Sequence, residues 1–295
     1  MVHYFKLMRP AQWMKNLFVF APLFFSRNLT NTDLLLFTCM AFAVFCMASS
    51  AVYCLNDILD LESDKAHPLK RHRPLASGMV SVRGALWTTV LCVTVAVIIT
   101  IVLDNLASSI WPLLIILFYW LLNIGYCVKM KNYAIIDVGF IGMGFVLRVL
   151  AGGAVTHIWI SQWLLLLTFL LAVFLALSKR TSEFHLDEKR LLESKRKSID
   201  GYNVLFLYTA IAVVASVIMV CYIQYTISLE VMIRMGSPYL YATTIFVLGG
   251  LLRYMQLMMV YHHVEGPTRA LVKDLFLQVC IVGWGLCYTI IIYLL

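Results

Sequence analysis

Residues 36–64 read LFTCMAFAVFCMASSAVYCLNDILDLESD, so twenty uncharged residues run directly into a segment that carries three aspartates. An apolar run of that length crosses the ~30 Å of hydrocarbon in a bilayer as one α-helix. Charged groups exposed to lipid cost several kcal/mol, so the aspartates must mark the point where the helix reaches water. The sequence therefore predicts a membrane-spanning helix with an acidic motif at its aqueous end.

The composition of the whole chain has the same membrane character. Hydrophobic residues make up 62% of the 295 positions and charged residues 13%, against about 25% charged residues in soluble domains. The first fifteen residues lack the pattern of a cleavable signal peptide. Eight cysteines lie singly in apolar stretches, which favours core residues over disulfides or zinc ligands. We expect an all-α, polytopic membrane protein that forms one integral membrane domain over residues 1–295.

The distribution of positive charge orients the expected helices. Nine spans are expected, at residues 16–32, 36–55, 84–103, 110–128, 134–155, 160–177, 204–226, 238–260 and 274–294, and Pro22 and Arg27 interrupt the first. Of the 23 Lys and Arg residues, 19 fall in the N-terminal segment and the even-numbered loops, and only Arg27 and Arg234 fall in the opposite loops. Positively charged loops stay in the cytoplasm. We expect a multi-pass protein of the inner (plasma) membrane, with its N-terminus and its two long charged loops cytoplasmic; the charge thus reflects topology, and no nucleic acid partner is expected.

The second expected span ends in the pattern N-D-x-x-D-x-x-x-D, at Asn56, Asp57, Asp60 and Asp64. Helical spacing would put the three carboxylates on one face, where they repel each other unless a cation lies among them. Magnesium binds a few carboxylates together with phosphate oxygens. The pattern therefore predicts that these three aspartates are the catalytic, metal-binding residues and that the cofactor is Mg²⁺.

A basic stretch, HPLKRHRPLASG at residues 67–78, follows the acidic motif. Lys70, Arg71 and Arg73 are suited to binding phosphate and diphosphate groups, and the prolines and the glycine favour an ordered turn. Acidic and basic groups this close together at a membrane surface predict a metal–diphosphate site. The alternative is a loop that only anchors topology and contacts anionic lipid, but anchoring has no use for three aspartates on one face.

These motifs resemble the UbiA superfamily of membrane prenyltransferases. The N-terminal pattern Arg9-Pro10-x-Gln12-Trp13-x-Lys15-Asn16 followed by FVFAPLFF, the HPLKRHRPLASG stretch, and FVLRVLAGG at 145–153 are similar to the decaprenyl-phosphate phosphoribosyltransferase branch. The resemblance covers the first two-thirds of the chain. It implies a UbiA-like bundle that transfers 5-phosphoribosyl from phosphoribosyl diphosphate to a polyprenyl phosphate and releases diphosphate, with Mg²⁺ on the diphosphate of the donor.

The loop after the sixth expected span departs from the quinone and haem prenyltransferases, which carry a second aspartate-rich motif there. In this chain Lys179 and Arg180 precede Glu183 and Asp187. The more basic loop resembles the phosphoribosyl branch, whose donor carries an additional 5-phosphate. The role of Asp187 stays open.

Several other polar residues have two interpretations each. Lys129 and Lys131 could bind phosphate or be interfacial lysines whose ammonium groups reach toward the headgroups. Asp137 and Arg148 share one stripe of the fifth span, where a charge is functional by default; Asp137 could contact metal or ribose, and Arg148 could bind phosphate or support the bundle. The candidate substrate-binding residues are Lys15, Asn56, Lys70, Arg71, Arg73, Lys129, Asp137, Arg148, Lys179, Arg180 and Glu183.

Four further residues are left outside the predicted site. Arg253, in the eighth span, is expected to form a structural ion pair or to line a lipid cavity, and His262 and His263 are expected to be surface residues. Arg9, with Lys15, could receive the lipid phosphate or anchor the chain at the interface.

Two other functions remain to be separated from phosphoribosyl transfer. The first is a UbiA-type prenyltransferase that attaches an isoprenoid diphosphate to an aromatic or haem acceptor. The second is a transporter of anionic lipid or phosphate, which would place charged residues at midmembrane on broken helices related by an internal repeat; the sequence has no clear repeat. The expected partners are phosphoribosyl diphosphate, polyprenyl phosphate and the lipid bilayer, and the oligomeric state is open.

Overall fold

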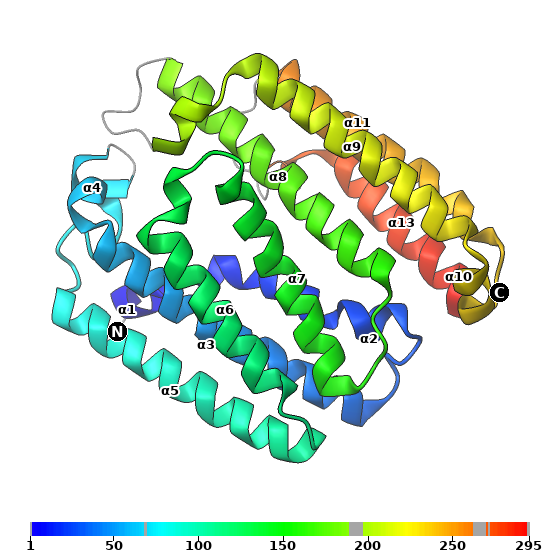
Figure 1. The fold of residues 1–295 in the computed structure, drawn as a ribbon, viewed down its shortest axis with the longest axis horizontal. Helices are drawn as coiled ribbons and strands as arrows, with labels where there is room; N and C mark the ends of the chain where they lie inside the picture. The colour runs from blue at the N-terminus through cyan, green and yellow to red at the C-terminus, as the bar shows by residue number, and fades with distance from the viewer. Residues whose placement is uncertain (1, 68–69, 189–196, 262–269, 271, 294–295) are drawn as a thin grey trace. The chain divides into compact units, whose positions relative to one another are not determined.

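The computed structural model describes residues 2–67, 70–188, 197–261, 270 and 272–293, and these are helical or irregular throughout. Eight described helices are long and apolar enough to cross a membrane, as expected for an all-α, multi-pass membrane protein (Figure 1). They are α3 (Thr32–Leu59), α5 (Val82–Ala107), α6 (Trp111–Val128), α7 (Ile136–Thr156), α8 (Gln162–Glu188), α9 (Val204–Ile227), α11 (Thr244–Met259, preceded by η5, Tyr239–Thr243) and α13 (Leu275–Tyr293).

The segment expected to form the first span, residues 16–32, is not a single long helix. It is covered in part by the 3-10 helix η1 (Pro10–Phe20), which continues into the short α2 (Ala21–Phe25). A proline stands near the start of each, and Arg27 adopts a positive φ of 65° just beyond them. Because a 3-10 helix rises about 2 Å per residue and an α-helix 1.5 Å, η1 and α2 together cover about 30 Å. The count of nine spans is therefore not confirmed: the described residues contain eight long helices and this composite segment.

The chain divides into two compact units, which are described separately. Unit 1 comprises residues 1–160 and 191–198, and unit 2 comprises residues 161–190 and 199–295. The shorter elements of unit 1 are α1 (Val2–Leu7), α4 (Leu61–Ala66), η2 (Lys70–His72) and η3 (Met130–Asn132). Unit 2 also contains α10 (Leu229–Met235), and η4 (Lys197–Gly201) lies where the two units join in sequence. The expectation of one domain stays a prediction.

In unit 1, α3 packs against η1, α5, α6 and α7. Small residues such as Ala41, Ala48 and Ala51 are buried along α3, which allows neighbouring helices to approach closely. η1 and α7 approach each other closely: a Cβ on Gly152 would lie 2.0 Å from the carbonyl oxygen of Val19. Gly152, within the FVLRVLAGG stretch, is thus required by the direct contact with the backbone of Val19.

Polar contacts join several helices of unit 2. Trp284 donates a hydrogen bond to the Tyr222 hydroxyl at 2.7 Å, which joins α13 to α9. Arg253 on α11 forms an ion pair with Asp274 at 2.7 Å, the structural alternative expected from the sequence. Asp274 also accepts a hydrogen bond from the backbone of Leu277 at the start of α13. The hydrogen bond from Arg253 lowers the pKa of the Asp274 carboxyl from its ordinary value.

The packing of η1 on α7 can be tested with an alanine at Gly152. Gly152→Ala forces a methyl group into the Val19 carbonyl, and overpacking of this kind costs about 1–3 kcal/mol. We expect a clearly lower midpoint of thermal unfolding for the detergent-purified protein. Gly139→Ala, on the same helix and with nothing within 4 Å of the new Cβ, is the matched control and should leave the midpoint unchanged or slightly raised. Equal midpoints for the two variants would contradict the close contact.

Candidate functional site

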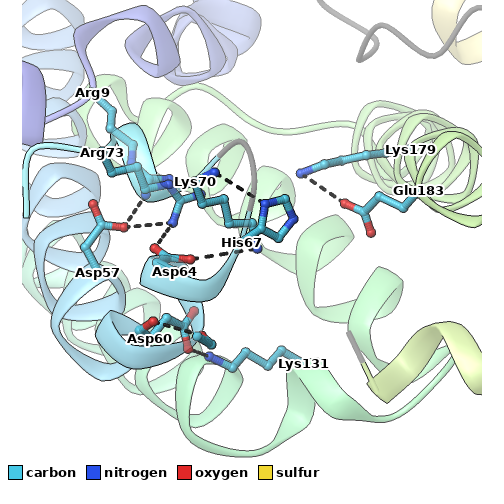
Figure 2. A network of polar contacts seen from close by, with 11 residues as sticks. Arg9, Asp57, Asp60, Asp64, His67, Lys70, Arg73, Lys131, Lys179 and Glu183 are labelled. Carbon is cyan, nitrogen blue, oxygen red and sulfur yellow. Dashed lines mark hydrogen bonds and ion pairs between the residues drawn. The ribbon is translucent and has the colours of Figure 1, made fainter. Parts of the chain in front are cut away.

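The acidic motif lies where α3 ends and α4 begins. The last residue of α3 is Leu59, Asp60 has φ −96° and ψ 9°, and α4 begins at Leu61. The helical spacing that would place all three carboxylates on one face assumes a continuous helix, and the helix stops within the motif. Asp57 and Asp64 come together, whereas Asp60 points to a different partner (Figure 2). The one-face expectation is therefore wrong for Asp60.

Asp57 is buried, at 2% exposure, between two arginines. Arg9, from the turn between α1 and η1, forms an ion pair with Asp57 Oδ1. Arg73, from the basic stretch, places its Nη1 3.1 Å from the same oxygen. The Arg9 guanidinium also lies over the ring of Tyr53, 5.0 Å from its centroid, and Arg9 itself has a positive φ of 54°. The N-terminal segment is therefore bound directly to the acidic motif.

Asp64 is as deeply buried as Asp57 and contacts the same arginine. Its Oδ2 lies 2.5 Å from Arg73 Nη1, and its Oδ1 lies 4.0 Å from Lys70 Nζ. Arg73 thus bridges two buried carboxylates, as Figure 2 shows. Arg73 and Lys70 are themselves partly exposed, so the basic side of the bridge lies at the surface of unit 1.

Asp60 forms an ion pair with Lys131 at 2.5 Å. Lys131 lies in η3, between α6 and α7, 71 residues away in sequence. Lys129, which the sequence marked as the candidate, is exposed at the end of α6. The structure therefore places the neighbouring lysine at the acidic motif.

The two bridged carboxylates fit a divalent cation that shares its ligands with a diphosphate. Three or more His, Cys, Asp or Glu side chains do not converge as a ready cation cage anywhere in the described part of the chain. Asp57 and Asp64 nevertheless approach one and the same positively charged nitrogen. Magnesium often takes only one or two protein carboxylates when phosphate oxygens and water complete its octahedron. The pair suits such a shared site better than a dedicated protein cage.

Two other residues of the predicted site are enclosed within unit 1. Arg148 is buried on α7, donates hydrogen bonds to Asn16 Oδ1 at 2.8 Å and to the Tyr119 hydroxyl at 3.1 Å, and bonds the carbonyl of Gly144. These contacts favour the bundle-supporting role over phosphate binding. Asp137 is fully buried and accepts a hydrogen bond from Ser198 at 3.4 Å, which joins α7 to η4.

The remaining candidates of unit 1 are at or near the surface. Arg71 is exposed, whereas Asn56 at the end of α3 and Lys15 on η1 are half-buried.

In unit 2, the C-terminal part of α8 carries Lys179, Arg180 and Glu183. Arg180 is 1% exposed and forms an ion pair with Glu183, and Lys179 Nζ lies 3.9 Å from Glu183 Oε1 (Figure 2). Just before them, Ser178 shares a hydrogen bond of 2.9 Å with the Tyr254 hydroxyl on α11. α11 therefore fixes the part of α8 that carries the basic pair. The side chain of Asp187 and both His262 and His263 lie outside the described residues.

Sequence patterns did not reveal some of the contacts described above within each unit. The pairing of Arg9 with Asp57 spans 48 residues and leaves no local signature. Tyr53 lies four residues before Asp57, so helical spacing alone could have placed its ring beside the acidic motif. Tyr254 carried no signal, because a tyrosine in an apolar span is indistinguishable from a core residue.

Comparison with known proteins agrees with this architecture. Residues 16–279 match the model of the UbiA prenyltransferase family. The chain is 30% identical to the decaprenyl-phosphate phosphoribosyltransferase of Corynebacterium glutamicum, over 98% of this chain and 86% of the relative, and 35% identical to that of Mycobacterium tuberculosis, over 74% and 71%.

The fold is also similar to that of a UbiA homolog from Archaeoglobus fulgidus bound to DMAPP and Mg²⁺. The TM-score is 0.70 at 15% identity, over 99% of both chains. The family model matches residues 16–279, and the relative from Corynebacterium glutamicum is 30% identical over 98% of this chain. The chain therefore belongs to the UbiA prenyltransferase family and is a multi-pass membrane transferase.

Proposed function

We propose that the chain transfers the 5-phosphoribosyl group of phosphoribosyl diphosphate to a polyprenyl phosphate of the decaprenyl type. The observation that carries the proposal is the pair of buried carboxylates, Asp57 and Asp64, joined by Arg73 within a basic stretch suited to diphosphate. The curated relatives named decaprenyl-phosphate phosphoribosyltransferase support the substrate pair. The sequence around Lys179 and Arg180, which is basic where other branches carry aspartates, supports a donor with an additional phosphate.

In this proposal Asp57 and Asp64 hold Mg²⁺ on the diphosphate of the donor, and Asp60 is the third acidic residue of the site. Solved structures of a UbiA homolog bound to Mg²⁺ with GPP or DMAPP support a divalent cation at a diphosphate. When bound, Mg²⁺ would neutralise the diphosphate as it leaves. Arg9 holds Asp57 in place through its ion pair and its stacking on Tyr53. Lys70 and Arg73 are placed to neutralise phosphate oxygens, because both lie at the exposed edge of the carboxylate pair.

The protein groups are expected to act by position and charge. The phosphate of the lipid acceptor is already ionised at neutral pH, so no side chain has to remove a proton from it. Its oxygen would attack the anomeric carbon from the face opposite to the diphosphate, and the configuration would invert. Bringing two anions together requires compensating cations fixed in advance, and this electrostatic preorganisation is a large term in enzyme catalysis. The arginines and lysines of the site supply it.

The orientation in the membrane follows from the charge of the loops. The loops on one side of the membrane carry 19 Lys and Arg residues, and those on the other side carry two. We therefore place the protein in the inner membrane, with the N-terminus and the acidic motif on the cytoplasmic side. The water-soluble donor would then reach the site from the cytoplasm, and the prenyl chain would lie in the bilayer.

The second candidate is transfer of an isoprenoid diphosphate to an aromatic or haem acceptor, which the GPP and DMAPP complexes of the structural relative favour. Transport of anionic lipid has less support, because both arginines within the spans, Arg148 and Arg253, have partners inside their own unit.

One experiment separates these functions. The purified chain in liposomes is given phosphoribosyl diphosphate labelled in the ribose together with decaprenyl phosphate, and in parallel labelled GPP with aromatic acids. We expect the label in the lipid fraction of the first reaction only, and only with Mg²⁺ present. Label transferred only from GPP would replace the proposal by the second candidate. Movement of unmodified decaprenyl phosphate between leaflets, with no covalent product in either reaction, would favour transport.

Replacing an acidic residue by its amide tests the role of the motif. Asp57→Asn and Asp60→Asn keep the shape of the side chain and remove the charge, so we expect at least a hundredfold lower rate of transfer, in line with the loss of one electrostatic stabiliser. The amount of protein in the membrane should not fall. Lys6→Ala, at an exposed position of α1, should change the rate less than twofold. Transfer at a near-normal rate by Asp60→Asn would remove Asp60 from the metal site.

The two lysines near η3 give a second test. Lys131→Met breaks the ion pair with Asp60, and loss of a group that orients a carboxylate of the site costs roughly 10–100-fold in activity. We expect a rate of transfer at saturating Mg²⁺ that is at least tenfold lower in Lys131→Met than in Lys129→Met. If Lys129→Met has the larger effect, the sequence-based choice of Lys129 was correct and the contact with Asp60 is structural.

A further inference from the structure

Arg73 stands in an unusual position for a phosphate-binding residue, because it is already bound by two carboxylates of its own site. Its Nη1 lies 3.1 Å from Asp57 and 2.5 Å from Asp64. Both carboxylates are 2% exposed, and two buried negative charges this close require a compensating cation. A single guanidinium nitrogen of Arg73 supplies it to both.

The other contacts of the two carboxylates do not replace this bridge. Asp57 keeps the ion pair with Arg9, but Asp64 has Lys70 only at 4.0 Å. Removing one partner from a buried ion pair leaves an uncompensated charge and is strongly unfavourable. Departure of Arg73 from the pair is therefore strongly unfavourable unless another cation takes its place.

The surroundings of Arg73 make such an exchange feasible. Its backbone N–H bonds the carbonyl of Lys70 at 2.9 Å, and its own carbonyl accepts from Ser77 at 2.9 Å, so the main chain is fixed. The side chain is 26% exposed, and the carboxylates that it bridges are not. Rotation of the side chain alone would move the guanidinium from the carboxylates toward the surface. A guanidinium binds carboxylate and phosphate with similar geometry, so a phosphate oxygen is a suitable new acceptor.

We propose that Arg73 occupies the place of the divalent cation between Asp57 and Asp64, and that the cation enters only together with a diphosphate that accepts the displaced guanidinium. The inference rests on the proposed function, since it takes this pair to be the metal–diphosphate site. A cation that binds without a diphosphate has to displace the Arg73 guanidinium from the carboxylates. No anion is then present to accept the displaced guanidinium. The species that binds is then the cation–diphosphate complex, and Arg73 passes from the carboxylates to the phosphate.

The exchange predicts how the affinities change when Arg73 is removed. The apparent affinity of a ligand falls in proportion to the fraction of protein that is competent to bind it. If Arg73 leaves the carboxylates free in about a tenth of the molecules or fewer, its removal should strengthen binding of the cation alone by about tenfold or more. The same removal should weaken binding of the complex, because the diphosphate loses a guanidinium.

Mn²⁺ is a suitable probe, because binding lowers the free-ion signal in electron paramagnetic resonance. The full-length protein in detergent is titrated with Mn²⁺ alone, and retention of radiolabelled pyrophosphate is then measured at saturating Mn²⁺. For Arg73→Gln we expect at least tenfold tighter Mn²⁺ binding than in the unmodified protein and at least fivefold weaker retention of pyrophosphate. Arg73→Lys keeps the charge but lacks the planar guanidinium. Its Mn²⁺ affinity and its retention of pyrophosphate should lie between those of the unmodified protein and those of Arg73→Gln.

Two further variants make the test specific. Lys65→Gln removes a charge next to Asp64 from an exposed residue that pairs with Glu62, and should change Mn²⁺ affinity less than twofold. Asp64→Asn combined with Arg73→Gln should abolish the gain, which would locate the Mn²⁺ at the carboxylate pair. Mn²⁺ affinity that is unchanged or weaker in both Arg73 variants, with thermal unfolding midpoints like that of the unmodified protein, would overturn the inference.

The outcome is separable from that of the proposed function. A tenfold gain in Mn²⁺ affinity with no phosphoribosyl transfer would leave the exchange valid and the donor wrong. Phosphoribosyl transfer with a Mn²⁺ affinity independent of Arg73 would leave the reaction valid and remove the exchange alone.

Discussion

The compensation of buried negative charge at the end of α3 is the interaction on which the site depends. Asp57 and Asp64 are almost fully enclosed, and an ionised carboxylate in that environment is strongly unfavourable without a paired cation. The chain supplies the cations from two distant segments, Arg9 from the N-terminus and Arg73 from the basic stretch. The same electrostatic requirement thus holds both segments against the acidic motif.

The packing of η1 determines where Arg9 can lie, since Pro10 begins that helix. Asn16 on η1 is fully buried and donates to Ser49 on α3 at 3.3 Å, and it accepts a hydrogen bond from Arg148 on α7. Gly152 lets the same segment rest directly on α7. A polar contact and a close backbone approach therefore fix η1 against both neighbouring helices. Arg148, although charged and within a span, contributes to the site by support, which is one way in which an intramembrane charge is functional.

Much of this architecture follows from local sequence, and the rest depends on long-range contacts. Apolar length predicts the eight long helices, and the motif from Asn56 to Asp64 with its basic partner predicts an anion- and cation-binding end of α3. The spacing argument failed at the break at Asp60, because it assumed a continuous helix. Apolar length did not indicate that residues 10–20 form the 3-10 helix η1. The choice of Lys131 over Lys129 depends on a contact across 71 residues. No local pattern carries that information, because two lysines at one helix end are equivalent until the tertiary fold is known.

The summed charge of the side chains around the motif also favours joint binding of a cation and a diphosphate. This argument does not depend on any single contact. Three aspartates face four cations, Arg9, Lys70, Arg73 and Lys131, so the charges of these side chains nearly cancel. A divalent cation alone would add positive charge to a site with cations in excess. A diphosphate alone would bring several negative charges beside two buried carboxylates, and like charges at short range repel in a medium of low dielectric constant. The two together alter the balance least, so a nearly neutral site made of opposed charges favours the complex over either component.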